Sequence, residues 1–262
     1  MGRTKSKRTV DPDQQPFLAH LIELRDRLLS IVKVVVLIFL VLSPFANGLY
    51  SALAEPLISS LPEGATMIAT EVASPFLTPF KFAFVFAIFV AMPFILYQAW
   101  AFIAPGLYSN ERKIVFPLLV SSSLLFYFGV AFAYFIVFPL AFGFLMGTAP
   151  EGVAVMTDIS RYLDFVLKMF FAFGLAFEVP VATFLIIRAG LSTPDDLAKK
   201  RPYVIVGAFV FGMLFTPPDI VSQVLLAVPM WLLFEVGIVA ARRFNGAEND
   251  ESKDSSAETS DK

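Results

Sequence analysis

The sequence of 262 residues contains no cysteine and only one histidine, His20. The absence of cysteine excludes disulfides and thiolate metal ligands. A single histidine is too few for a histidine-rich metal site, and it makes a Ser-His-Asp triad hard to build. We therefore expect neither a metal ion nor a cofactor.

Charged residues are scarce in the long middle part of the chain, where apolar residues dominate. Hydrophobic residues make up 57% of the sequence and aromatic residues 15%, including 30 phenylalanines. These shares are far above those of an ordinary soluble domain and indicate a membrane protein. Residues 1–16 are polar and basic without an apolar core, so we do not expect a cleavable signal peptide.

Uncharged runs predict an all-α protein with six transmembrane helices. An amphipathic helix over residues 17–29 leads into the first span from an N-terminal segment, residues 1–30. A proline-rich stretch, residues 55–79, indicates an ordered external loop after that span. The predicted spans are residues 34–54, 82–110, 114–150, 162–187, 202–218 and 220–234.

The lengths of these runs predict how each helix fits the bilayer. The second and third exceed the roughly 20 residues of one crossing, so they should tilt or kink, with bends at Pro93, Pro117 and Pro139. The fifth and sixth, at about 17 and 15 residues, predict short helices. Their connection should form an external tip at Pro217, Pro218 and Asp219.

Basic residues alternate between loops, which sets the orientation. They precede span one, follow span two at Arg112 and Lys113, and recur at residues 188–201 and 242–243. The positive-inside rule places all these segments, and therefore both termini, in the cytoplasm. The six-helix domain is predicted over residues 31–243, followed by a disordered cytoplasmic tail, residues 244–262, that is polar and poor in apolar residues.

The polar loop from Trp100 to Lys113 is the first candidate site. An acid, two bases and an aromatic anchor at a membrane surface can bind a charged peptide. The alternative is that Glu111 is a solvated helix cap that pairs with Arg112 or Lys113. Thr193 and Pro194 are the expected N-cap and first residue of a short helix in a later loop.

Two further acids are singled out by their place in the sequence. Glu23, on the amphipathic helix, could bind a ligand or could simply pair with Arg27 four residues later. Glu178 lies inside span four, where an ionisable group costs roughly 2.5 kcal/mol or more and marks a functional site or a structural pair with a polar neighbour.

Six short motifs together resemble one family of transport proteins. They are HLIELR at 20–25, ASPF at 73–76, WAFIAP at 100–105, FEVP at 177–180, KRPY at 200–203 and TPPD at 216–219. Their residues and their order resemble TatC, the multispanning receptor of the twin-arginine protein translocase, from about Phe17 to Phe244. A departure from the family pattern is Lys113, where close relatives often carry a second arginine after Glu-Arg.

The resemblance implies a concave, glove-like arrangement of six helices in the bacterial inner membrane and no enzymatic activity. It implies export driven by the proton-motive force, single-span TatA and TatB as partners, a homo-oligomer within the receptor complex, and no nucleic acid. It also implies that the signal peptide of a folded precursor binds to the cytoplasmic segment and first loop. The matching residues are Glu23, Arg25, Phe102, Glu111 and Arg112.

Two other classes of function remain as alternatives at this stage. A secondary transporter or channel could also have six spans and an intramembrane acid, but the two halves show no evident inverted repeat and no glycine-broken helix pair. A membrane enzyme would need clustered histidines or paired acids at one depth, and the sequence offers a single histidine.

Overall fold

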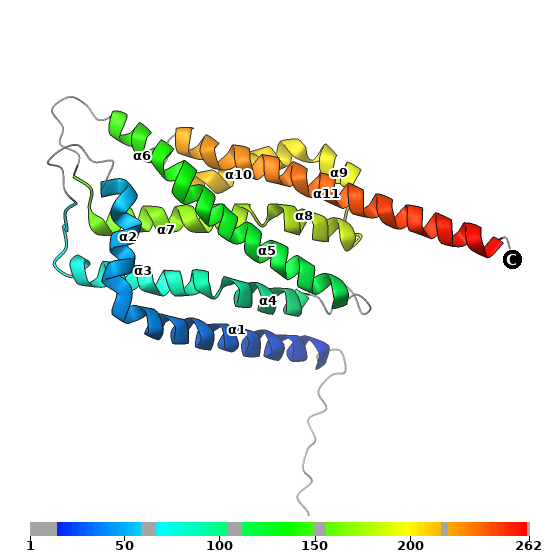
Figure 1. The fold of residues 1–262 in the computed structure, drawn as a ribbon, viewed down its shortest axis with the longest axis horizontal. Coiled ribbons are helices and arrows are strands. Elements are labelled where there is room, and N and C mark those ends of the chain that lie inside the picture. Colours follow the sequence, from blue (N-terminus) through cyan, green and yellow to red (C-terminus); the bar gives the residue numbers. More distant parts are fainter. Residues whose placement is uncertain (1–14, 59–66, 104–111, 149–155, 216–219, 261–262) are drawn as a thin grey trace, which may run out of the picture.

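The computed structural model describes residues 15–58, 67–103, 112–148, 156–215 and 220–260, and within these ranges the chain is almost entirely helical. The described pairing between extended segments is a single parallel bridge between Ile68 and Asp158. The helices lie side by side (Figure 1). The prediction of an all-α membrane fold is confirmed.

The N-terminal amphipathic stretch and the first span form one helix, α1 (Gln15–Leu42). A 3-10 turn, Ser43–Phe45, follows with Pro44 in its first turn, and α2 (Ala46–Ile58) then runs across the ends of the neighbouring helices (Figure 1). The sequence places a boundary near residue 30 and ends the span at Ala54. The structure shows no break near residue 30, because no proline or glycine interrupts the helical period there.

The second span is a bent pair, α3 (Ser74–Val90) and α4 (Met92–Ile103), whose axes differ by 51°. The bend lies beside Pro93, as predicted. The start was predicted at Phe82 and is wrong by about two turns, since the helix already begins at Ser74. Pro75 occupies the first turn, where a missing N–H is tolerated, and Pro79 is accommodated inside the helix.

The third span consists of α5 (Arg112–Phe132), a π-helical turn (Ala133–Val137) and α6 (Phe138–Gly147). The π-turn accounts for Pro139, which has no N–H for the carbonyl four residues before it. Pro117 lies within α5. The predicted kink of this span is therefore a local widening of the helix at the position of Pro139.

The fourth span is α7 (Ile159–Ala176) followed directly by α8 (Val179–Arg188). The short helix α9 (Pro194–Lys199) begins as predicted: Thr193 is its N-cap, and its hydroxyl accepts a hydrogen bond from the Asp196 backbone N–H at 3.1 Å. The fifth span, α10 (Arg201–Phe215), has 15 residues and is short, as predicted.

The last helix, α11 (Ile220–Ser260), is longer than the sequence analysis predicts. Its uncharged part ends at Glu235, but the apolar helix runs to Arg243 because Glu235 is paired with a base rather than ending the span. The helix continues past Arg243 to Ser260, over the residues for which the sequence analysis predicts a tail. The segment after Arg243 contains no proline, the residue that interrupts a helix most strongly.

Six crossings fit these elements. Four helical stretches in the described ranges are long and apolar enough to span a membrane, α3 with α4 makes a fifth, and α10 is a shorter apolar helix. We call "the basic end" the side where α1 starts, α5 starts, α8 ends and α9 lies; it is on the right in Figure 1. The opposite end carries α2 and the segments before α3 and α7.

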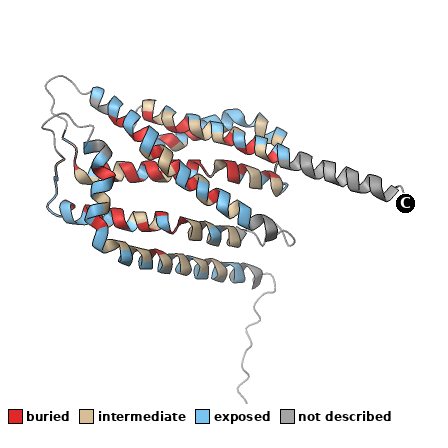
Figure 2. Cartoon of the chain, viewed as in Figure 1, coloured by how far each residue is buried: buried red, intermediate tan, exposed pale blue. Residues whose placement is uncertain are grey.

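Aromatic side chains pack together in the centre of the helix bundle. Helix α7 is the most buried element and packs against α3 and α5, whereas α1 is mostly half-exposed or exposed (Figure 2). Phe126, Phe138 and Phe173 are fully buried between α5, α6 and α7. In a membrane protein apolar side chains can face lipid as well as the core, so burial among other helices is the sign of a central position. By this measure α7 is the central helix of the fold.

A polar clasp closes the opposite end. Asp158 is buried and caps α7: one carboxylate oxygen accepts hydrogen bonds from the backbone N–H of Ser160 and Arg161. The other accepts from the Thr70 backbone N–H at 2.9 Å and the Thr70 hydroxyl at 2.7 Å. This one side chain therefore ties the segment before α3 to the start of α7.

Candidate functional site

A groove at the basic end lies between α1 and α4. It has a volume of about 430 Å³ and is open to the outside. Its lining includes two acids, one base and one amide: Glu23, Asp26, Arg27 and Gln98. The sequence analysis singled out Glu23 but missed Asp26 and Gln98; Asp26 lies three residues after Glu23 on the same helical face, which is the signal that could have found it.

Glu23 is held by a guanidinium group in the structure. Its Oε1 accepts hydrogen bonds from Arg27 Nε at 2.9 Å and Arg27 Nη2 at 2.6 Å. Arg27 also donates to Gln98 Oε1 at 2.9 Å and to the carbonyl of Ala101 at 3.1 Å. The local ion pair that the sequence left open is thus present, and Arg27 connects α1 to α4 as well.

Phe102 lies beside this ion pair. Its ring stacks on His20, with ring centroids 4.1 Å apart and planes 13° from parallel. His20 Nδ1 in turn lies 3.8 Å from Glu23 Oε2. The structure therefore brings together two of the predicted site residues, Glu23 and Phe102, although nearly eighty residues separate them in sequence.

Among the remaining predicted residues at the basic end, Arg25 has a different partner. Arg25 is 67% exposed and pairs with its neighbour Asp26 at 2.8 Å, on the far side of α1 from Glu23. Glu111 lies outside the described residues, and Arg112 is described only as the first residue of α5. Trp100 to Ile103, predicted in the loop, belong to α4 because their apolar side chains continue its helical pattern.

Glu178 sits where α7 passes into α8. It is the N-cap residue of α8, with Pro180 in the first turn, and its Oε2 accepts a hydrogen bond from the hydroxyl of Ser122 on α5. Its other oxygen, Oε1, is buried and has no donor among the described residues. The polar neighbour that the sequence left open is therefore Ser122. Pro217, Pro218 and Asp219, the predicted external tip, lie outside the described residues.

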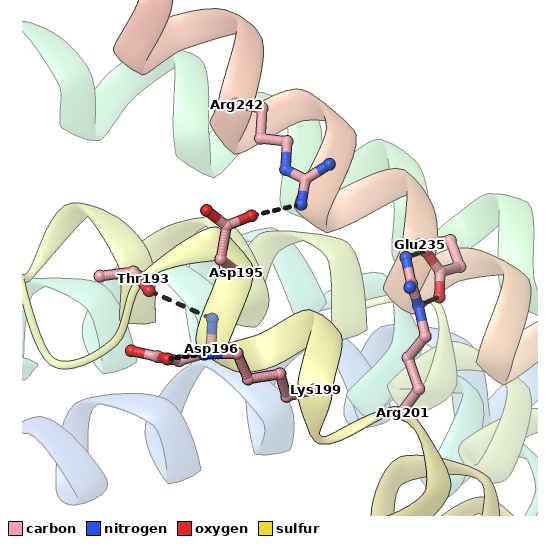
Figure 3. A network of polar contacts seen from close by, with 7 residues as sticks. All are labelled: Thr193, Asp195, Asp196, Lys199, Arg201, Glu235 and Arg242. Atoms are coloured by element: carbon pink, nitrogen blue, oxygen red, sulfur yellow. Dashed lines mark hydrogen bonds and ion pairs between the residues drawn. The ribbon is translucent and has the colours of Figure 1, made fainter.

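A network of ion pairs joins the last three helices (Figure 3). Arg201, the first residue of α10, binds Glu235 on α11 through two hydrogen bonds of 2.5 and 2.7 Å. Arg242 on α11 binds Asp195 on α9 at 2.7 Å. The short α10 is thus fixed to α11 at the basic end.

The match to known proteins identifies the family. The family model described as "Sec-independent protein translocase protein (TatC)" matches residues 19–229. This chain belongs to the TatC family. The family match also favours protein translocation over a solute transporter, a channel or a membrane enzyme.

Relatives and solved structures agree with this assignment. The TatC of Escherichia coli K12 is 59% identical over 234 residues, which cover 89% of this chain and 91% of the relative. That of Azotobacter chroococcum mcd 1 is 58% identical over 245 residues, 93% of this chain and 96% of the relative. A crystal structure described as the twin arginine translocase receptor TatC superposes with a TM-score of 0.75 at 40% identity, covering 85% of this chain and 98% of that one.

The family and the fold together define the general role. The chain is a multispanning membrane protein and a component of the Sec-independent, twin-arginine protein translocase. In the described residues, no group of three or more His, Cys, Asp or Glu side chains could hold a metal ion.

Proposed function

We propose that the chain is the receptor subunit of the translocase and that it binds twin-arginine signal peptides at the groove between α1 and α4. The observation that carries the proposal is the contact between Glu23 and Arg27, in which the carboxylate already holds a guanidinium group in the groove. Arginine is bound there through two N–H groups, which a lysine cannot imitate. Phe102, next to this contact, offers an apolar surface to the rest of the peptide.

Arg27 and the peptide compete for Glu23 in this proposal. An incoming arginine takes the place of Arg27 on Glu23, and Arg27 keeps its bonds to Gln98 and to the Ala101 carbonyl. Because a buried guanidinium without partners is costly, these two remaining acceptors lower the free energy needed for the exchange. Arg27 is only 24% exposed, so it depends on such acceptors.

Glu111 is the proposed acceptor for the second arginine of the peptide. It immediately precedes Arg112, the first residue of α5, and follows in sequence after α4, whose Gln98 lines the groove. Two carboxylates match two guanidinium groups. Arg25 and Arg112 are proposed to bind the peptide backbone rather than its arginines.

Orientation and partners follow the same proposal. The basic end faces the cytoplasm of a bacterial cell with both termini there, since a signal peptide must be read before export. Single-span TatA and TatB subunits bind to this chain, which forms a homo-oligomer within the receptor complex, and the proton-motive force drives translocation. Glu178, inside the membrane, takes part in the assembly of this complex. The likeness to twin-arginine translocase receptors supports these assignments.

A binding experiment with two precursors tests the site. Glu23→Gln and Glu111→Gln should each weaken binding of an Arg-Arg precursor by about ten- to a hundredfold, the loss of one charged hydrogen-bonding site. The loss should be smaller for a Lys-Lys precursor, which does not use the two N–H groups. Glu71→Gln, which removes an exposed acid at the opposite end, is the control for net charge. Equal losses for both precursors would refute the assignment.

A further inference from the structure

Helix α7 is the most buried helix of the described chain (Figure 2), yet a narrow stripe along it is exposed. Its exposed residues are Arg161, Lys168 and Leu175, which follow one another at intervals of seven residues. Residues seven apart lie on one face of an α-helix. Asp164, which is partly buried, falls between Arg161 and Lys168 on the same face. The exposed stripe is therefore charged near the start of α7 and apolar near its end.

A fourth charged side chain, Lys81, comes from α3. Its ammonium group donates a hydrogen bond to a carboxylate oxygen of Asp164, and both side chains are half-exposed. The side chains of Arg161 and Lys168 have no hydrogen bond or ion pair to any residue that the structure describes. The cluster thus holds three bases and one acid, and the acid already has a partner. We call these four residues the charged stripe.

The charged stripe lies at the depth where lipid headgroups meet the hydrocarbon layer. Helices α7 and α8 form one stretch of 30 residues, Ile159–Arg188. At 1.5 Å per residue this stretch is about 45 Å long, so roughly 7 Å extends beyond the hydrocarbon layer of about 30 Å at each end. Asp164 lies about five residues, or roughly 8 Å, from the start of α7. Lys168 is one turn deeper, but its side chain leans toward the start of the helix, so its ammonium group can reach the level of Asp164.

Depth and charge together indicate the kind of ligand. A cation that faces hydrocarbon is unfavourable unless a negative group is near. At this depth the phosphate of a phospholipid is the negative group that the membrane itself provides. A zwitterionic headgroup brings its own cation, which the three bases repel, whereas an anionic headgroup does not. Deeper along the stripe, Leu175 and the partly buried Phe171 offer an apolar surface to an acyl chain.

We propose that the charged stripe is a binding site for an anionic phospholipid of the leaflet at the opposite end. Arg161 and Lys168 bind the phosphate, Lys81 adds positive charge while it holds Asp164, and an acyl chain lies along α7 toward Leu175. In the proposed orientation of the chain, this leaflet faces away from the cytoplasm. The inference does not depend on the signal-peptide site, which lies at the basic end.

Lys33 on α1 provides a matched control. It is also an exposed lysine inside a helix, but no other charged residue lies within four residues of it on either side. Lys33→Gln and Lys168→Gln therefore change the net charge equally and differ only in the surroundings of the lysine. Lys168→Arg keeps the charge, and Asp164→Asn removes the acid that competes with a phosphate for the bases.

The test is a lipid titration of the purified full-length chain in detergent, read by native mass spectrometry. Phosphatidylglycerol and phosphatidylcholine with the same acyl chains are compared. Lys168→Gln should weaken binding of the first phosphatidylglycerol about fivefold, the effect of one base near an anionic headgroup, and should leave phosphatidylcholine binding unchanged. Lys33→Gln and Lys168→Arg should bind both lipids like the unaltered chain. Arg161→Gln should resemble Lys168→Gln, and it replaces that variant if Lys168→Gln lowers the amount of folded chain.

Asp164→Asn should change lipid binding in the opposite direction. Because this variant frees Lys81 and removes a negative charge, phosphatidylglycerol should bind several-fold more tightly. A purely structural role of the Lys81–Asp164 pair would give no such gain. Weaker binding in Asp164→Asn would contradict the proposal.

Three other results would overturn the proposal. Equal weakening in Lys33→Gln and Lys168→Gln would show that only the net charge of the chain matters. Equal weakening for both lipids would show that the charged stripe does not select an anionic headgroup. Unchanged lipid binding in Lys168→Gln would refute the site, and loss of copurifying partner subunits in that variant would assign Lys168 to a carboxylate on a partner helix instead. Failure of the signal-peptide site would appear only in precursor binding, which this titration does not measure.

Discussion

Substitution of Arg27 tests whether a precursor arginine replaces Arg27 on Glu23 or whether the Glu23–Arg27 ion pair is purely structural. Arg27→Gln removes the internal guanidinium and leaves Glu23 available, so binding of an Arg-Arg precursor should become several-fold tighter. Glu23→Gln should have the opposite effect. The measurement is precursor titration against membranes that contain equal amounts of each variant. Weaker binding in Arg27→Gln would show that Arg27 belongs to the recognition surface.

Asp158 gives the opposite end a defined pH dependence. Hydrogen bonds from Thr70, and then from the backbone N–H groups at the start of α7, lower the pKa of Asp158 from 3.8 to about 2. Because the folded pKa lies below the unfolded one, the carboxylate contributes stability above about pH 4, and this contribution is lost as the pH falls toward 2.

Asp158→Asn should therefore remove a stabilising contribution that is fully present at neutral pH. The thermal midpoint of the purified chain in detergent should fall for this variant, and its pH dependence between 5 and 2 should flatten. Glu71→Gln is the matched control, since Glu71 is an exposed acid on the same segment before α3 as Thr70. An unchanged thermal midpoint at pH 7 in Asp158→Asn would show that the hydrogen bonds of Asp158 do not stabilise the fold.

At the scale of helices, the crossing of α5 and α7 depends on two glycines. Gly129 faces backbone atoms of Phe173 and Gly174 faces the ring of Phe126, both closer than a Cβ permits. Gly129→Ala and Gly174→Ala should each destabilise the fold by about 1–3 kcal/mol through overpacking. Thermal unfolding and the amount of chain in membranes measure this loss.

Gly207 on α10 is the control for that experiment, because nothing lies within 4 Å of a Cβ added there. Gly207→Ala should be neutral or stabilising by up to about 1 kcal/mol, owing to the better helix propensity of alanine. If Gly207→Ala and Gly174→Ala lowered the stability equally, the close approach of α5 and α7 at Gly174 would not be the cause of the loss.

The ion pair between α10 and α11 leads to a second prediction at the scale of helices. Arg201 and Glu235 form a two-bond contact that fixes the start of a helix of only 15 residues. Glu235→Arg should lower the amount of assembled protein, and the additional change Arg201→Glu should restore much of it, because the two-bond contact can form in reverse. No restoration would indicate that one of the two side chains has a separate role.

Helix boundaries show what the sequence could and could not predict. Uncharged length and proline position were sufficient for six spans, for the bend beside Pro93 and for the cap at Thr193. They failed where proline is tolerated in a first turn, as at Pro75, and where an acid is paired, as at Glu235. Such cases depend on partners that are distant in the sequence, such as Arg201.

The candidate site was predictable in part for the same reason. Glu23 and Phe102 could be named from family motifs, and the Glu23–Arg27 pair from helical spacing. The bonds from Arg27 to Gln98 and the Ala101 carbonyl, and from Ser122 to Glu178, join separate helices. No local pattern contains them, because they arise only from how α1 packs on α4 and α5 on α7.

For the whole molecule, the orientation in the membrane is the prediction on which the site depends. Since the chain has no native cysteine, one cysteine can be introduced at each end. Val72, before α3, and Leu191, after α8, are both highly exposed. The start of α3 and the end of α8 lie at opposite ends of the helices in Figure 1.

If the basic end is cytoplasmic, V72C should react with a membrane-impermeant maleimide in cells whose outer membrane is permeable. L191C should react only after the inner membrane is opened. The positive-inside bias requires this pattern because Arg188 and the bases at 199–201 flank Leu191, while the segment around Val72 carries none. Labelling of L191C alone in intact cells would place the groove outside, where it could not bind a signal peptide before export, and the proposed function would have to be abandoned.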